Sequence, residues 1–149
     1  MAAFLPIPDV LTQPFWDGCR RGVINVQCCQ SCRRLRHRPS AGCHWCGEQR
    51  VDWMELSGRA TVYTYTIVHR AFHPSFADEV PYIVALVAAE EDPTVRFHTR
   101  IVECELSQIY VAMKVEVVFR KESDGTVLPF WRPTANPSKP SANAVRGAI

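Results

Sequence analysis

Long apolar segments are missing from this sequence of 149 residues. No run approaches the ~18 apolar residues that a membrane-spanning helix needs, so we expect no membrane association. The longest apolar stretch, 82–89, has the length of a β-strand and is followed by three acidic residues. Residues 1–10 lack the basic segment and the apolar run of an export signal. We therefore expect a reducing, cytoplasmic setting for the seven cysteines.

Recognisable catalytic motifs are missing as well. There is no glycine-rich phosphate loop and no Gly-x-Ser-x-Gly turn. His69 and His73 lie four residues apart, but Pro74 places them in a loop rather than on one face of a helix. The formal net charge of +2 is too small to indicate a nucleic-acid partner. We therefore predict no catalytic residue in this chain and do not expect it to act as an enzyme alone.

Two Cys-x-x-Cys pairs are the clearest chemical feature that is present. Cys29 and Cys32 form the first pair, and Cys43 and Cys46 the second, with ten residues between the pairs. Two such turns facing each other make a closed site of four thiolates, which suits Zn²⁺ or iron better than Mg²⁺ or Ca²⁺. Because four protein ligands leave no position open for water or substrate, we predict a structural zinc ribbon.

Three other interpretations of these cysteines remain. A disulfide framework requires secretion, for which no export signal is visible. A thioredoxin-like site requires one Cys-x-x-Cys in a strand–helix unit, whereas this segment has two pairs in polar, turn-rich surroundings. The four cysteines could also be unrelated free thiols, but chance would then have to place four of the seven cysteines in two matched pairs.

The segment before the cysteines predicts an arm followed by a short helix. Thr12 is placed to cap a helix over residues 14–21, and Gly22 to end it. Two adjacent aromatic residues of this helix, Phe15 and Trp16, must cover either the protein's own core or a partner.

Arginines gather between the two cysteine pairs. Arg33, Arg34, Arg36 and Arg38 surround His37. Such a cluster could bind nucleic-acid phosphates, an acidic protein surface or the phosphates of a cofactor. It could equally be a solvated rim, as most charge runs are.

From residue 57 the sequence has β character. Segments rich in β-branched and aromatic residues predict five strands, at 60–68, 82–90, 95–102, 115–121 and 126–131. Five short strands without a long helix favour a small closed barrel of the OB-fold type. The connection 69–81 is long and aromatic, which is typical of a functional loop, and we expect a short helix within 104–113.

These observations predict a mainly β protein in four parts. They are an N-terminal arm and helix (1–22), a zinc ribbon (23–56), an OB-fold barrel (57–132), and a tail (133–149) that is mobile or ordered by a partner.

The order of motifs resembles one known family. It runs PFWDGCRRG, the two cysteine pairs, SGRATVYTYTIVHRAFHPSFADEVPYIVALV, VEVVF and LPFWRP. From residue 14 to 133 the chain resembles the thiolase-associated OB-fold proteins with an N-terminal rubredoxin-like zinc ribbon, a family of unknown function. The resemblance implies a structural ribbon metal and an accessory role beside a thiolase or a thiolase-like aldolase in lipid or aromatic degradation. It also implies a two-plus-two hetero-oligomer and a coenzyme A thioester shared with the partner.

The resemblance also suggests roles for individual residues. It carries the metal ligands over to Cys29, Cys32, Cys43 and Cys46. It suggests that the adenosine phosphates of coenzyme A are held by Arg33, Arg34 and Arg36. The residues expected to face the partner are Phe15, Trp16, Arg70, Phe72, His73 and Phe76.

Four positions depart from the family pattern. Glycine usually follows the second cysteine of the first pair, where this chain has Arg33, and the second pair usually contains proline, where it has His44. The family's barrel commonly has glycines at the positions of Glu103 and Ala112.

Two other functions compete with the accessory role. OB-folds often bind nucleic acid, and Tyr63 and Tyr65 are expected on one face of their strand, although few Lys or Arg residues accompany them. An enzyme acting alone, as a hydratase or an acyl transferase, would need a base and a nucleophile that the sequence does not offer.

Overall fold

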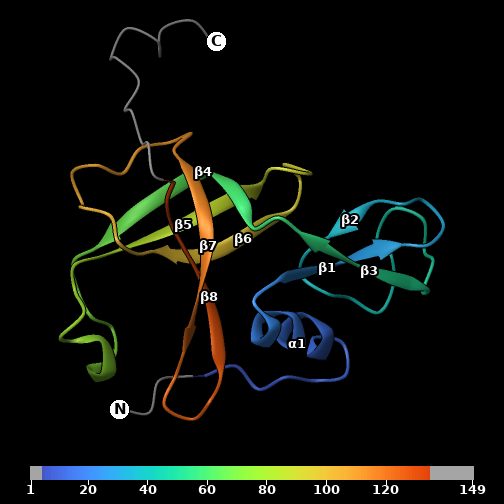
Figure 1. The fold of residues 1–149 in the computed structure, drawn as a ribbon, viewed down its shortest axis with the longest axis horizontal. Coiled ribbons are helices and arrows are strands. Elements are labelled where there is room, and N and C mark those ends of the chain that lie inside the picture. Colours follow the sequence, from blue (N-terminus) through green and yellow to red (C-terminus); the bar gives the residue numbers. More distant parts are fainter. Residues whose placement is uncertain (1–4, 135–149) are drawn as a thin grey trace, which may run out of the picture.

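The computed structural model describes residues 5–134 and shows a small sheet beside a closed barrel (Figure 1). In this range the chain forms one α-helix, one 3₁₀-helix and eight strands. The fold class predicted from the sequence, with a helix, a ribbon and a five-stranded OB-fold barrel, is confirmed. Most of the predicted tail, from residue 135 onwards, lies outside the described residues.

Helix α1 spans Gln13–Arg21 and ends at Gly22, whose φ of 80° is easily adopted only by glycine. Thr12 stands at the N-cap, but its side chain makes no capping hydrogen bond to the helix. Its hydroxyl accepts from the backbone N–H of Asp9 and donates to the Asp9 carboxylate. The predicted side-chain cap at Thr12 is therefore wrong, because the preceding turn uses this hydroxyl first.

The ribbon contains a three-stranded antiparallel sheet in the order β2-β1-β3. Strand β1 (Ile24–Cys29) lies between β2 (Leu35–Arg36) and β3 (Val51–Leu56), and every residue of β1 is buried. Gly18 allows α1 to approach β1 closely, since a Cβ atom there would lie 2.9 Å from the carbonyl oxygen of Val23.

The barrel has the strand order β4-β5-β6-β8-β7. Its strands are β4 (Arg59–Val68), β5 (Tyr82–Ala89), β6 (Arg96–Ile101), β7 (Lys114–Lys121) and β8 (Val127–Pro133). All neighbours are antiparallel except β6 and β8, whose parallel register is fixed by a single pair, Ile101 with Trp131. Gly58 leads into β4 where the chain crosses β7, and a Cβ atom there would lie only 2.3 Å from Val117.

An irregularity in β4 separates two tyrosines that were expected on one face. The register with β5 shifts between Val62 and Thr64, and such a bulge reverses the alternation of side chains. Tyr63 is exposed, whereas Tyr65 packs against the core. The expected pair of stacking tyrosines is therefore wrong.

Three residues other than glycine have positive φ angles within residues 5–134. They are Arg33 (58°), Glu103 (55°) and Ala112 (72°). These are the three positions at which the resemblance led us to expect glycine. Each side chain there is held in a backbone conformation that glycine adopts more easily. The segment between β6 and β7 holds turns, and the short helix expected within 104–113 is not formed.

A series of aromatic rings joins α1, the ribbon and the barrel. The ring of His37, in the loop after β2, lies 5.1 Å from that of Phe15 on α1 and 4.4 Å from that of Phe97 on β6. Phe97 in turn stacks on Trp131 of β8 at 5.3 Å. No helix within residues 5–134 is long and apolar enough to cross a membrane.

Candidate functional site

The two cysteine pairs form matching turns at one end of the ribbon. In the first turn the N–H of Arg33 donates to the carbonyl of Cys29 at 3.0 Å, and in the second the N–H of Gly47 donates to the carbonyl of Cys43 at 2.8 Å. Both donor residues have positive φ angles, 58° at Arg33 and 77° at Gly47. Each turn thus directs two sulfur atoms toward the same point.

The four sulfur atoms fit a tetrahedral metal site. All four Sγ atoms lie within 4.8 Å of one another. Cys29 and Cys46 are 3.6 Å apart, and Cys32 and Cys43 are 3.7 Å apart. A tetrahedron with Zn–S bonds of about 2.3 Å has edges of about 3.8 Å. The donor set therefore suits a soft divalent ion such as Zn²⁺.

The thiols at this end of the ribbon are shifted in opposite directions. A backbone hydrogen bond at Arg34 lowers the pKa of Cys32, but burial and the neighbouring cysteines outweigh it and raise this pKa to about 11. Burial raises the pKa of the Cys43 thiol, but backbone hydrogen bonds at Trp45 and Cys46 outweigh burial and lower it to about 6. In α1 burial is the dominant cause, and it raises the pKa of Cys19 to about 12. Cys19 is thus an inert part of the core.

The arginine cluster does not present a common surface. Arg33 forms a 2.8 Å ion pair with Asp52, and Arg34 lies over the ring of Trp45 at 5.0 Å. Arg36 is only 4% exposed, and its guanidinium donates to the side-chain oxygen of Gln27 at 2.6 Å. The placement of Arg36 argues against its predicted role in binding phosphate, while the roles of Arg33 and Arg34 stay predictions.

The two aromatic residues of α1 have different environments. Phe15 is 6% exposed and belongs to the core. It therefore covers this chain's own interior, which argues against its predicted contact with a partner. Trp16 is partly buried, with one side against the core and another on a pocket described below.

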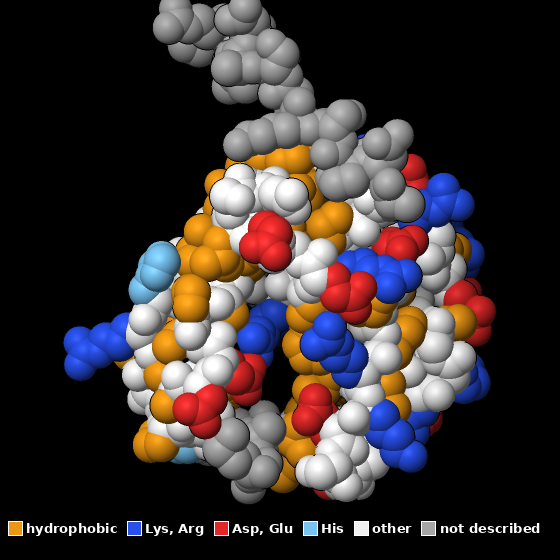
Figure 2. Space-filling model, turned by 60° about the vertical axis from the view of Figure 1, so that its left-hand side comes forward, with side chains coloured by type: hydrophobic (Ala, Val, Ile, Leu, Met, Phe, Trp, Pro, Cys, Tyr) orange, Lys and Arg blue, Asp and Glu red, His pale blue; other side chains and the backbone are white. Residues whose placement is uncertain are grey.

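The loop between β4 and β5 carries the other residues expected to face a partner. It contains the 3₁₀-helix η1 (Pro74–Phe76), which His73 caps by accepting a hydrogen bond from the N–H of Ser75 at 3.1 Å. Phe76 lies against Tyr82, with 6.4 Å between ring centres. Phe72 is 91% exposed, and Arg70 is exposed beside it. Figure 2 shows this side of the molecule, where apolar side chains border a hollow and charged ones lie around it.

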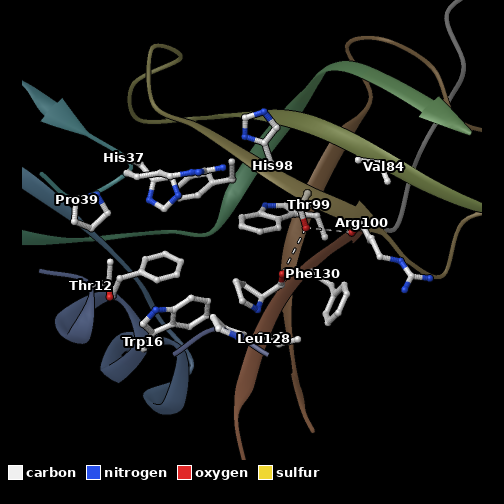
Figure 3. A pocket seen from close by; sticks show the side chains of 16 residues that line it. Thr12, Trp16, His37, Pro39, Val84, His98, Thr99, Arg100, Leu128 and Phe130 are labelled. Carbon is white, nitrogen blue, oxygen red and sulfur yellow. Dashed lines mark hydrogen bonds between the residues drawn. The ribbon is translucent and has the colours of Figure 1, made fainter. Parts of the chain in front are cut away.

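A pocket of about 610 Å³ opens where β6 and β8 part (Figure 3). Beyond the pair of Ile101 with Trp131 no further residue of β6 pairs with β8, and Pro129 has no N–H to offer a neighbouring strand. Trp16 of α1 lies across from Phe130 of β8 in this opening.

Sequence reasoning missed this pocket because its walls come from distant segments. The motif LPFWRP and the arginine-rich segment were both conspicuous, but nothing in either indicated that they meet. Their proximity depends on the ring series through His37 and on the separation of β6 from β8.

Comparison with known proteins gives consistent matches. The sequence profile described as "ChsH2, C-terminal OB-fold domain" matches residues 53–120. A protein of Thermomonospora curvata named "Probable enoyl-CoA hydratase alpha subunit" is 33% identical over 120 residues, which cover 80% of this chain and 36% of that protein. This chain therefore spans about a third of the length of that relative.

Two further relatives match most of their own length. A "DUF35 domain-containing scaffold protein" of Methanocaldococcus jannaschii is 33% identical over 105 residues, which cover 69% of this chain and 72% of the relative. The solved structure titled "Ltp2-ChsH2(DUF35) aldolase" has a chain that is 30% identical, with a TM-score of 0.78. That match covers 87% of this chain and 98% of the other. The chain thus belongs to the DUF35 family of OB-fold proteins.

Proposed function

We propose that this chain is a non-catalytic accessory subunit that binds and completes a thiolase-like acyl-CoA enzyme. The partner would perform thiolysis or retro-aldol cleavage of a carbon–carbon bond. Support comes from relatives named as scaffold proteins, as a hydratase subunit and as part of an aldolase. Because these names describe other proteins, the proposal also needs a feature of this chain that is suited to a partner.

The exposed aromatic side chain of Phe72 is the observation that carries the proposal. Its side chain is 91% exposed although it belongs to an anchored loop. The 3₁₀-helix follows it directly, and Glu79 at the end of the loop pairs with Arg100 of β6. Ile7 and Val10 of the N-terminal arm are also more than nine-tenths exposed. A large aromatic side chain held exposed on an anchored loop is the kind of side chain that can anchor an interface with another protein.

Zinc has a supporting role in this proposal. The four thiolates of Cys29, Cys32, Cys43 and Cys46 would hold Zn²⁺, which supplies folding energy rather than catalysis because no ligand position stays open. The ribbon residues then hold α1 and the Arg33–Arg34 turn in place. These two arginines remain our candidates for contact with the phosphates of a coenzyme A thioester bound by the partner.

A binding experiment with Phe72→Ser tests the proposed surface. Burying a phenylalanine side chain stabilises an interface by about 1.5–3 kcal/mol, so the variant should bind the thiolase-like enzyme about 10- to 100-fold more weakly. The measurement is isothermal titration of the co-expressed, separated subunits. The isolated variant should unfold at the wild-type temperature, because Phe72 contributes little to the core.

Val111→Ser provides the matched control. Val111 is 57% exposed and lies in the loop between β6 and β7, where it shares a surface pocket with Ala88 and Lys114 and with no residue of the β4–β5 loop. It should leave binding unchanged. Two subunits that elute separately, or a Phe72→Ser variant that binds as tightly as the wild type, would contradict the proposed surface. The mass of the complex measures its stoichiometry, for which we propose two plus two.

A further inference from the structure

The pocket between β6 and β8 has the shape and surface of a site for a flat apolar group. Its volume of about 610 Å³ lies within the range of small-molecule sites. Aromatic and proline rings dominate its lining, among them Trp16, Phe97, Phe130 and Pro129. These rings come from α1, β6 and β8, so the pocket is bounded by regular elements rather than by loop tips alone (Figure 3).

The charged groups of this pocket are all of one sign. Arg38 and Arg100 line it, together with two histidines, and no acidic residue is among its lining residues. Arg100 is already paired with Glu79. Arg38 is exposed and makes no ion pair or hydrogen bond with any residue of the described range, 5–134. A free guanidinium at an apolar pocket is a ready partner for a carboxylate.

We propose that this pocket binds a small carboxylate with an aromatic or alicyclic body. The apolar ring lies among the aromatic walls, and the carboxylate lies toward Arg38. The proposal goes beyond the accessory role and does not depend on the partner enzyme, because every group it uses belongs to this chain.

The test uses the purified, metal-containing full chain and two probes of nearly equal shape. Isothermal titration compares 2-naphthoate, an aromatic anion, with 2-naphthamide, its neutral analogue. The wild type should bind the anion at least about fivefold more tightly, as a charge-assisted hydrogen bond implies. Arg38→Gln should remove this preference by weakening naphthoate about fivefold while leaving the amide unchanged.

Two further variants separate a built site from general attraction to positive charge. Arg59→Gln removes an exposed guanidinium outside the pocket and should leave both affinities unchanged. Leu128→Trp fills the pocket and should abolish binding of both probes, with its fold checked by thermal unfolding. The indole N–H resonances of Trp16 and Trp131 should shift on addition of naphthoate.

Several outcomes would overturn the proposal. These are equal affinity for the two probes, an equal loss in Arg59→Gln and Arg38→Gln, and retained binding in a folded Leu128→Trp variant. Failure of both probes to bind at millimolar concentration would also overturn the proposal. A side chain of a protein partner would then be the better candidate for the pocket. None of these outcomes bears on whether Phe72 binds the thiolase-like enzyme, so the two proposals fail separately.

Discussion

His37 links the stability of this protein to pH. Burial lowers the pKa of the His37 imidazole from its ordinary 6.5 to about 4, and the positive charge of Arg38 contributes in the same direction. The folded chain therefore binds fewer protons at this ring than the unfolded chain between pH 6.5 and pH 4. The contribution of neutral His37 to the free energy of unfolding is therefore complete above pH 6.5 and is lost as the pH drops from 6.5 to about 4. A shift from 6.5 to about 4 corresponds to a total loss of about 3 kcal/mol.

The assay is urea unfolding of the wild type and of His37→Leu at pH 8 and pH 5. Between pH 8 and pH 5 the free energy of unfolding of the wild type should fall by about 2 kcal/mol more than that of the variant. Leucine fills a similar volume between Phe15 and Phe97, so its packing cost is independent of pH. Protonation of the cysteine thiolates affects both proteins equally and cancels in the difference. Equal losses in the two proteins would refute a neutral, buried His37 in the ring series.

Three further predictions concern the backbone and the metal site. Ala112→Gly should raise the free energy of unfolding by about 0.5–1 kcal/mol in chemical unfolding, because φ at Ala112 is 72°, a conformation that favours glycine. The control Ala77→Gly should lower the free energy of unfolding by a similar amount, because φ at Ala77 is −59°, which alanine adopts without strain. Gly58→Ala should lower stability by about 2 kcal/mol or more, because the new Cβ would clash with β7; an unchanged melting temperature would contradict the close approach. Cys43→Ser should reduce the zinc content measured by mass spectrometry from about one ion per chain to near zero, and Cys104→Ser, a thiol outside the cluster, should keep it.

Local patterns in the sequence were sufficient to predict the elements of this fold. Alternating apolar residues place the five strands of the barrel within a few residues of their positions, and the spacing of Cys29 to Cys46 predicts a cluster whose sulfur atoms do converge. Both features depend on near neighbours in the chain. The bulge in β4 escaped prediction, because Tyr63 and Tyr65 alternate in the sequence as they would in a regular strand.

Burial of individual residues was harder to predict because it depends on distant segments. Arg36 belongs to a charged run, yet Gln27 on the neighbouring strand accepts its hydrogen bond and allows it to be buried. Phe15 and Trp16 are adjacent and similar in the sequence, but Phe15 is almost fully buried whereas Trp16 is only partly buried against the core. The pocket is lined by several segments that meet only in the folded chain, so no single motif indicates it.

Turnover of an acyl-CoA substrate distinguishes an accessory subunit from an enzyme. An accessory subunit should show no turnover alone, and the thiolase-like enzyme mixed with this chain should turn over faster than that enzyme alone. The gain should be smaller with Phe72→Ser at equal concentration. Turnover by the isolated chain, or a partner whose rate is the same with and without it, would contradict an accessory role.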